Sequence, residues 1–168
     1  MITELKKLHL HDYHAENHAK FAEFAGWNMP LSYGSSLDEH NGVRSDSRGF
    51  DVGHMGQLKV SGHAALKFLN YMLTNDLGNC GVGFAQYSLL CNEKGGVMDD
   101  LIVYRLSKDE FMLCVNASNV ETDFAYLEEK ISEYDCAILN LSNNFGLLAI
   151  QGPSTIAYLS KMLSLIHI

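Results

Sequence analysis

Proline is scarce in this chain, whose 168 residues contain only Pro30 and Pro153. No apolar run approaches the roughly 20 residues that a membrane-spanning helix requires, and neither an internal repeat nor a low-complexity tract is present. The four cysteines form no C-x-x-C pair, so neither a zinc motif nor a redox motif is expected. No membrane-spanning helix is therefore expected, and the composition is not that of a disordered or collagen-like chain.

Basic residues are also in the minority, with 12 Lys and Arg against 20 Asp and Glu and a net charge of −8. A nucleic-acid-binding surface needs a basic stripe, so no nucleic-acid partner is expected. An anionic small ligand remains compatible with this charge, because a few local cations are enough to hold one. The hydrophobic content of 47% is typical of a globular protein, and the length suffices for one ordinary domain or two small ones.

The N-terminus shows no targeting signal. Lys6 and Lys7 are not followed by the apolar stretch of a signal peptide, and the segment is not rich in Arg and Ser as a mitochondrial transit peptide is. Most of the cysteines lie among apolar residues, which is typical of buried thiols in a reducing compartment. We therefore expect a bacterial cytoplasmic protein.

The first part of the chain predicts little regular structure beyond two helices. Apolar positions over residues 1–20 suggest a helix, and residues 26–34 (GWNMPLSYG) suggest an irregular or extended segment. Residues 35–46 predict a second helix, because Asp38 and Glu39 in its first turn would suit the positive end of the helix dipole.

A denser pattern begins near residue 57 and predicts an α+β unit. Alternating and helical periodicities follow one another in the order strand, helix, three strands, helix, strand. This order is that of a ferredoxin-like antiparallel sheet with two helices and one added strand. The expected elements are a strand from about residue 57, a helix at 63–74, strands at 84–91, 97–106 and 111–115, a helix that begins near 118, and strands at 137–141 and 145–150.

We expect the ferredoxin-like domain to span residues 53–142. Residues 1–52 and 143–162 would then form a second domain that the chain leaves and re-enters, and that is only partly present. Residues 163–168 read Leu-Ser-Leu-Ile-His-Ile, which a common sequencing adapter encodes in one reading frame, so we expect a non-native tail there.

Two short motifs bear on how the later elements begin. Ser118 and Glu121 stand three residues apart ahead of a helical run, which predicts a capping box. The segment Asn92-Glu93-Lys94-Gly95-Gly96 predicts a turn between two strands. It is not a phosphate-binding loop, because no Lys-Ser/Thr pair follows it.

The adjacent carboxylates Asp99 and Asp100 are the clearest candidate chemistry. On a strand, neighbouring side chains point to opposite faces, so these two do not form a side-by-side acid–base pair. Asp100, Ile102 and Tyr104 would share one face of the sheet. Without further information, a purely structural role for Asp100 stays open, in which it caps a turn or pairs with a nearby cation.

The spacing of the histidines does not indicate a metal site. His54 lacks a second ligand at helical spacing, so a structural role is favoured. His9, His11, His14 and His18 cluster near the N-terminus, and only His14 and His18 stand four residues apart. A solvated helix face is favoured for them over a metal site.

Three segments of the chain form an ordered set of motifs. The segments are Phe24-Ala25-Gly26-Trp27-Asn28-Met29-Pro30-Leu31 with Tyr33-Gly34, Val43-Arg44 with Phe50-Asp51-Val52-Gly53-His54-Met55, and Gly95-Gly96-Val97-Met98-Asp99-Asp100-Leu101-Ile102-Val103-Tyr104. Together they resemble the glycine cleavage system T-protein family, and supporting matches occur in family order over nearly the whole chain to about residue 160. Each motif alone is weak, and the ordered set is specific. The family normally has Ser where this chain has Gly53.

The resemblance implies an aminomethyltransferase of glycine cleavage. Such an enzyme takes an aminomethyl group from the lipoyl arm of its partner H-protein, releases ammonia and passes the one-carbon unit to tetrahydrofolate. Neither a metal nor a covalent enzyme nucleophile is implied. The partners implied are tetrahydrofolate and lipoylated H-protein.

The resemblance also implies which residues form the site. Asp100 matches the catalytic aspartate, which could orient the folate's pterin ring, stabilise the positive charge that develops during transfer and assist proton movement. The family positions that line the folate pocket are matched by Met55, Tyr87, Asp100, Ile102, Tyr104 and Asn116. Ordinary core packing is a serious alternative for Met55 and Ile102.

Several other functions stay open at this point. One is a folate-binding protein of the same superfamily that serves iron–sulfur cluster assembly or tRNA modification. Another is the folate domain of a sarcosine- or dimethylglycine-type dehydrogenase, which would need a flavin-binding segment. A third is an inactive fragment, because the family's chains continue well past the point where this one ends.

Overall fold

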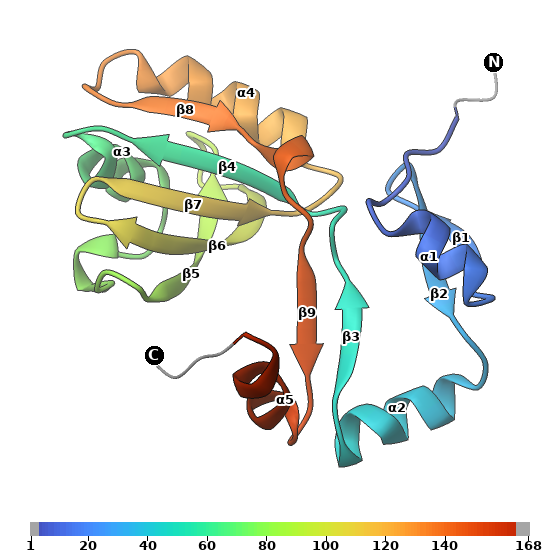
Figure 1. The fold of residues 1–168 in the computed structure, drawn as a ribbon. Helices are drawn as coiled ribbons and strands as arrows, with labels where there is room; N and C mark the ends of the chain where they lie inside the picture. The colour runs from blue at the N-terminus through green and yellow to red at the C-terminus, as the bar shows by residue number, and fades with distance from the viewer. Residues whose placement is uncertain (1–3, 164–168) are drawn as a thin grey trace. The chain divides into compact units, whose positions relative to one another are not determined.

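A computed structural model describes residues 4–163 and divides the chain into two compact units (Figure 1). Unit 1 comprises Met1–His54 with Gly146–Ile168, and unit 2 is Met55–Phe145. Residues 164–168, which make up most of the expected non-native tail, lie outside the described residues.

Unit 2 is built on a five-stranded antiparallel sheet with the strand order β5-β6-β7-β4-β8. The order β6-β7-β4-β8 is that of a ferredoxin-like sheet, and β5 is the added strand at its edge. The predicted α+β class and sequence of elements are therefore confirmed. The elements of unit 2 are β4 (Gly56–Ser61), α3 (Ala65–Met72), η1 (Leu77–Asn79), β5 (Ala85–Cys91), β6 (Val97–Ser107), β7 (Glu110–Val115), α4 (Val120–Ile131), β8 (Ala137–Asn140) and η2 (Ser142–Asn144).

Helices α3 and α4 cover one face of this sheet (Figure 1). The core lies between them and the strands, because most of the alternate strand residues that face the helices are apolar and buried. Phe68 and Leu69 of α3 and Leu127 of α4 are fully buried in it. The strands contribute Leu58, Val60, Leu90, Leu101, Val103, Phe111, Leu113 and Val115.

The alternation in β6 decides which carboxylate faces which side. Asp99 is buried at 4% exposure on the helix-covered face, with Leu101 and Val103. Asp100 is exposed on the opposite face with Ile102 and Tyr104. The predicted separation of the two carboxylates is confirmed.

A tight turn leads into β6 just before Asp99 and Asp100. Asn92 accepts hydrogen bonds at its side-chain Oδ1 from the backbone N–H groups of Lys94 and Gly96, both at 3.0 Å. Gly95 has a φ of 77°, a conformation that side chains disfavour. The turn predicted at 92–96 is confirmed.

Unit 1 contains two separate strand pairs. The β1–β2 hairpin turns at Ala25-Gly26, where both residues have positive φ, as a two-residue turn requires. Segments distant in sequence form the second pair, β3 with β9. The elements are α1 (His11–Glu16), β1 (Lys20–Phe24), β2 (Trp27–Ser32), α2 (Ser36–Ser45), β3 (Arg48–Asp51), β9 (Leu148–Gln151) and α5 (Thr155–Met162).

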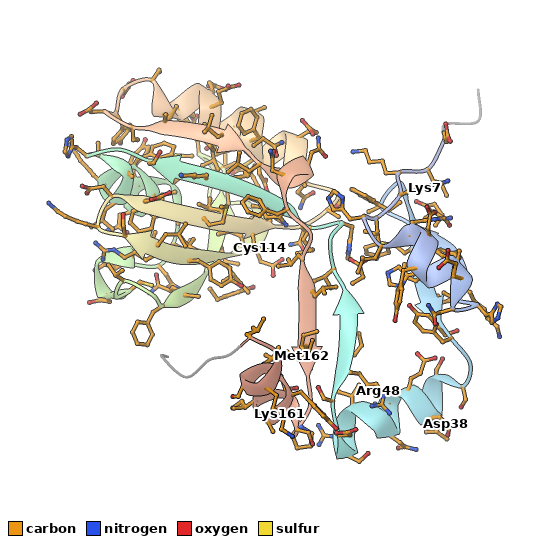
Figure 2. The ribbon with its side chains drawn as sticks, viewed as in Figure 1. Lys7, Asp38, Arg48, Cys114, Lys161 and Met162 are labelled. Carbon is orange, nitrogen blue, oxygen red and sulfur yellow. The ribbon has the colours of Figure 1, made fainter. Side chains whose placement is uncertain are left out.

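Helix α2 forms where it was predicted. The side chain of Ser35 accepts a hydrogen bond from the backbone N–H of Asp38, which satisfies one free donor of the first turn. Near the end of α2, a Cβ on Gly42 would lie 2.4 Å from the guanidinium of Arg48, which lies beside this helix (Figure 2).

Two local predictions are wrong. Residues 1–20 do not form one helix, because the backbone of Lys6 bonds to Gly26 and Asn28 beside the hairpin, and only α1 is helical. The capping box at Ser118 does not form. Asn119 is the residue before α4, and its side chain is drawn to Asp99 rather than to the helix backbone.

No helix within residues 4–163 is both long enough and apolar enough to cross a membrane.

Truncation of the core aromatic Phe68 to Ala is expected to reduce the free energy of unfolding by about 3–5 kcal/mol. The side chain is fully buried and packs against Tyr134, with ring centroids 5.2 Å apart. Urea unfolding measures the loss, with Phe84→Ala as the matched control because Phe84 is 71% exposed. Equal losses in the two variants would contradict this placement of the core.

Candidate functional site

The open face of the sheet in unit 2 presents a row of side chains across neighbouring strands. Tyr87 of β5 is paired with Ile102 of β6, and Ile102 is paired with Cys114 of β7. Figure 2 marks Cys114 within the sheet. Tyr87 is 55% exposed and Ile102 is 38% exposed. An aromatic ring and an aliphatic side chain therefore lie side by side, accessible to a ligand.

The carboxylate of Asp100, two residues before Ile102 on β6, is held by two neighbours. The hydroxyl of Tyr87 donates to Oδ2 of Asp100 at 3.1 Å, and Nδ2 of Asn116 donates to Oδ1 at 3.1 Å. The hydrogen bond to Asp100 is the largest cause of a raised pKa at Tyr87, because losing the proton would lose the bond. Asp100 thus has a fixed orientation on the open face.

Asn116 connects the two faces of β6. Its Nδ2 lies 2.9 Å from Oδ1 of Asp99 and 2.9 Å from the backbone carbonyl of Asp100, besides its contact with the Asp100 carboxylate. Its backbone N–H donates to Oδ2 of Asp99 at 3.0 Å. The donors of Asn116 are committed to the protein, so it acts as a clamp on both aspartates, and Oδ1 is the atom it can offer to a ligand.

Asp99 is a buried carboxylate that accepts several hydrogen bonds. Burial alone would raise its pKa, but hydrogen bonds from the backbone and side chain of Asn116, from Asp123 and from Asn119 together hold the pKa below its usual value. The contact from Asn119 is short, with Nδ2 2.6 Å from Oδ1. Asp99 is therefore ionised and ties the loop after β7 to β6.

Asp123 of α4 faces Asp99 from the helix layer and is fully buried. Burial, followed by the hydrogen bond to Asp99 and the charge of Asp99, raises the pKa of Asp123 to about 8. Neither of its oxygens receives a hydrogen bond. The raised pKa favours the protonated form of Asp123 at neutral pH.

The remaining predicted site residues lie on or near the same face. Tyr104 is 41% exposed, and burial followed by the proximity of Cys114 raises the pKa of its hydroxyl. Met55 precedes β4, is partly buried, and accepts a hydrogen bond at its backbone carbonyl from the side chain of Gln57. The geometry brings Tyr87, Asp100 and Asn116 into direct contact, while Ile102 and Tyr104 extend the same surface along β6.

A second polar cluster lies in unit 1 and was not predicted. His14 is buried, its Nε2 lies 2.9 Å from Oδ2 of Asp51, and its Nδ1 bonds the hydroxyl of Tyr33. Burial is the largest cause of the raised pKa of Tyr33, ahead of the neighbouring Tyr13, Asp51 and Glu39. The expectation of a solvated helix face is wrong for His14, because its partners are 19 and 37 residues away in sequence.

This cluster borders a hollow of about 600 Å³ within unit 1. Apolar Pro30 and Phe50 line it together with charged Glu39 and Arg48. No sequence spacing could have indicated the cluster, although Asp51 stands in one of the segments that carry the family resemblance.

The ring of His54 is partly buried beside Phe24. Burial lowers its pKa, against an opposing effect of Asp51, and Phe24 packs edge-on at 5.6 Å between ring centroids. Its Nδ1 is buried without a hydrogen-bond partner. Within residues 4–163 no group of three or more His, Cys, Asp or Glu side chains is arranged to hold a metal ion.

Comparison with known proteins shows the family. The model of the GCVT N-terminal domain matches residues 10–166. The chain therefore belongs to the GCVT N-terminal domain family, the glycine cleavage T-protein family whose motifs were recognised in the sequence.

An aminomethyltransferase from Staphylococcus haemolyticus is 44% identical over 153 residues, which cover 91% of this chain but 42% of that protein. The glycine cleavage system aminomethyltransferase T from Bartonella henselae has the same fold, with a TM-score of 0.89 and 42% identity over 94% of this chain and 43% of that one. The chain thus spans about two fifths of the length of these relatives.

Heterotetrameric sarcosine oxidase from Corynebacterium sp. U-96 is a more distant structural neighbour. It has a TM-score of 0.50 and 18% identity over 74% of this chain and 61% of that one. At this level of identity, the similarity supports a shared fold and no further inference.

Protonated Asp123 gives the chain a predictable pH dependence of stability. An unfolded Asp has a pKa near 3.9, whereas Asp123 in the folded chain has a pKa of about 8. Between these values the folded state binds one more proton, so stability falls as pH rises, by at most about 1.4 kcal/mol per pH unit, and levels off above the folded pKa. Asp99 has a lowered pKa in the folded chain and is ionised in both states between about pH 6 and about pH 8, so it adds no slope there.

Asp123→Asn is therefore expected to flatten the dependence between about pH 6 and about pH 8 and to be more stable than the parent chain at the upper end. Urea unfolding at a series of pH values measures both curves, and their difference isolates Asp123 from the other titrating groups. Parallel curves would show that Asp123 is ionised in the folded chain.

Proposed function

We propose that this chain is the folate-binding part of an aminomethyltransferase of glycine cleavage, which moves a one-carbon unit from aminomethyl-lipoyl H-protein to tetrahydrofolate with release of ammonia. The observation that supports it most is the fixed Asp100 carboxylate beside an exposed aromatic and aliphatic surface, in a chain of the T-protein family. The named relatives are aminomethyltransferases.

The surface fits the chemistry of a pterin. A flat ring can lie against Tyr87, Ile102 and Tyr104, whose exposed fractions are between 38% and 55%. The donors on a pterin edge need acceptors, and the Asp100 carboxylate and Oδ1 of Asn116 are available for them. Tetrahydrofolate would supply the nitrogen nucleophiles that accept the one-carbon unit.

Asp100 is proposed as the catalytic residue. Its fixed negative charge can stabilise positive charge that develops at the reacting centre, and its free lone pairs can receive or pass a proton there. Tyr87 and Asn116 would keep the carboxylate from rotating, so that its orientation is set before the ligand arrives. Met55, Ile102 and Tyr104 would contribute apolar contacts.

The partners and domain organisation follow from the same proposal. Lipoylated H-protein would deliver the aminomethyl group, and no metal is required by this chemistry. We further propose that residues 53–142 form the ferredoxin-like folate domain, and that 1–52 with 143–162 form part of a first domain whose remaining portion lies in the longer relatives. Residues 163–168 are proposed to be non-native.

Tetrahydrofolate is expected to bind the chain with a micromolar dissociation constant in anaerobic calorimetry. Asp100→Asn should weaken binding by about 1.5–3 kcal/mol, because hydrogen bonds to a charged partner are stronger than those to a neutral amide. Asp109→Asn is the matched control, since it makes the same change of charge in the β6–β7 turn, where Asp109 faces His63 at 3.8 Å.

A folded chain that does not bind tetrahydrofolate would contradict the proposal that these residues form the folate site, and would favour an inactive fragment. Equal weakening by both variants would contradict the role of Asp100. Binding without ammonia release when aminomethylated H-protein is added would favour a folate-binding protein with another task.

A further inference from the structure

Strand β5, which carries Tyr87, is an edge strand of the sheet within the described residues. The N–H and C=O groups on the outer side of an edge strand need partners other than a neighbouring strand. The segment between α3 and η1 supplies them, beginning with a bridge between Leu73 and Leu90. The backbone N–H of Thr74 donates to the carbonyl of Leu89 at 3.1 Å, and the N–H of Leu89 donates to Oγ1 of Thr74 at 3.2 Å. This segment therefore fastens the outer side of β5.

The backbone carbonyl of Tyr87 is bonded by Asn75, the next residue of this segment. In an antiparallel strand, the N–H and C=O of one residue point to the same side, and residues two apart share that side. Because the backbone groups of Leu89 point out of the sheet, the carbonyl of Tyr87 faces away from β6 as well. Nδ2 of Asn75 donates to this carbonyl at 2.6 Å, and the Asn75 N–H donates to Oγ of the buried Ser88 at 3.1 Å.

Asn75 is held in place by the residue that follows it. Oδ1 of Asp76 accepts from the backbone N–H of Gly78 at 2.7 Å and from Nδ2 of Asn70, on α3, at 2.9 Å. Nδ2 of Asn79 donates to the other carboxylate oxygen at 3.1 Å. Because these donors come from α3 and η1, the amide of Asn75 is presented to β5 from a fixed support.

The position of the Tyr87 side chain follows from the position of its backbone. The residue is 55% exposed, so core packing does not confine the ring, and its hydroxyl donates to Asp100 at 3.1 Å. A displacement of β5 would carry the ring with it and lengthen this hydrogen bond, which weakens steeply as its geometry worsens. The contact on the outer side of the strand therefore bears on the orientation of Asp100 on the open face.

We propose that Asn75 is a positioning residue, which holds the backbone of Tyr87 through its side-chain amide and thereby sets the position of the Tyr87 ring and the orientation of the Asp100 carboxylate. Water could replace the amide as a donor at this exposed site, so the bond contributes little to stability. Water could not fix the carbonyl relative to α3. The link to tetrahydrofolate rests on the proposed function, whereas the link from Asn75 to Tyr87 and Asp100 does not.

Two variants of Asn75 test the amide. Asn75→Asp keeps the size of the side chain and removes the donor, and Asn75→Ala removes the whole group. Asn17→Asp and Asn17→Ala are the matched controls, because Nδ2 of Asn17 makes the same kind of exposed bond in unit 1, to the backbone carbonyl of Tyr13 at 2.8 Å. Urea unfolding compares their stabilities. NMR follows the ring resonances of Tyr87 and the carboxyl resonance of Asp100 without ligand, and calorimetry measures tetrahydrofolate binding.

Both Asn75 variants should shift the resonances of Tyr87 and Asp100, and neither Asn17 variant should. The dissociation constant for tetrahydrofolate should rise by about fivefold or more in Asn75→Asp and by less than about twofold in Asn17→Asp. In a chain that already carries Tyr87→Ala, Asn75→Asp should change the dissociation constant by less than about twofold, because the effects of residues that act through one another do not add.

Unchanged resonances of Tyr87 and Asp100 in both Asn75 variants would overturn the proposal. An equal loss of binding from Asn75→Asp in the parent and in the Tyr87→Ala chain would also overturn it, because Asn75 would then act independently of Tyr87. A parent chain that binds no tetrahydrofolate defeats the proposed function, and the resonances recorded without ligand still decide whether Asn75 positions Tyr87.

Discussion

The ionised carboxylate of Asp99 is the group on which the rest of the site depends. It lies on the buried side of β6 and accepts hydrogen bonds from the backbone and side chain of Asn116 and from the side chain of Asn119. Because a buried charge without partners is strongly unfavourable, these donors have to stay in place. The loop between β7 and α4 is thereby fixed to β6, and Asp100, the next residue along the strand, is held on the opposite face.

The sequence was informative wherever short-range rules decide the structure. Period-two alternation predicted that Asp99 and Asp100 face opposite sides, and the order of strands and helices predicted the ferredoxin-like sheet. The turn at Asn92-Gly96 followed from its glycines, and the start of α2 from Ser35. Family motifs named the candidate residues of the open face, and those assignments remain predictions about binding.

Contacts between distant residues decided the features that sequence reasoning missed. Asn119 precedes α4 in place of a Ser118 capping box because its amide is used by Asp99, 20 residues earlier. His14 is buried by Asp51 and Tyr33 rather than solvated. Asp123 looks like one of several acidic residues in the first turn of a helix, where acids are common, and only its complete burial in the folded chain explains why its pKa is raised.

We propose that the open face of the sheet, with Asp100 fixed on it, receives the pterin of tetrahydrofolate. This can be tested by chemical-shift mapping of the labelled chain while tetrahydrofolate is added. If the pterin binds there, the largest changes should occur at Tyr87, Ile102, Tyr104 and Asn116, and the core residues Phe68 and Leu127 should change little. Changes centred on the hollow in unit 1, or spread through the helix layer, would contradict it.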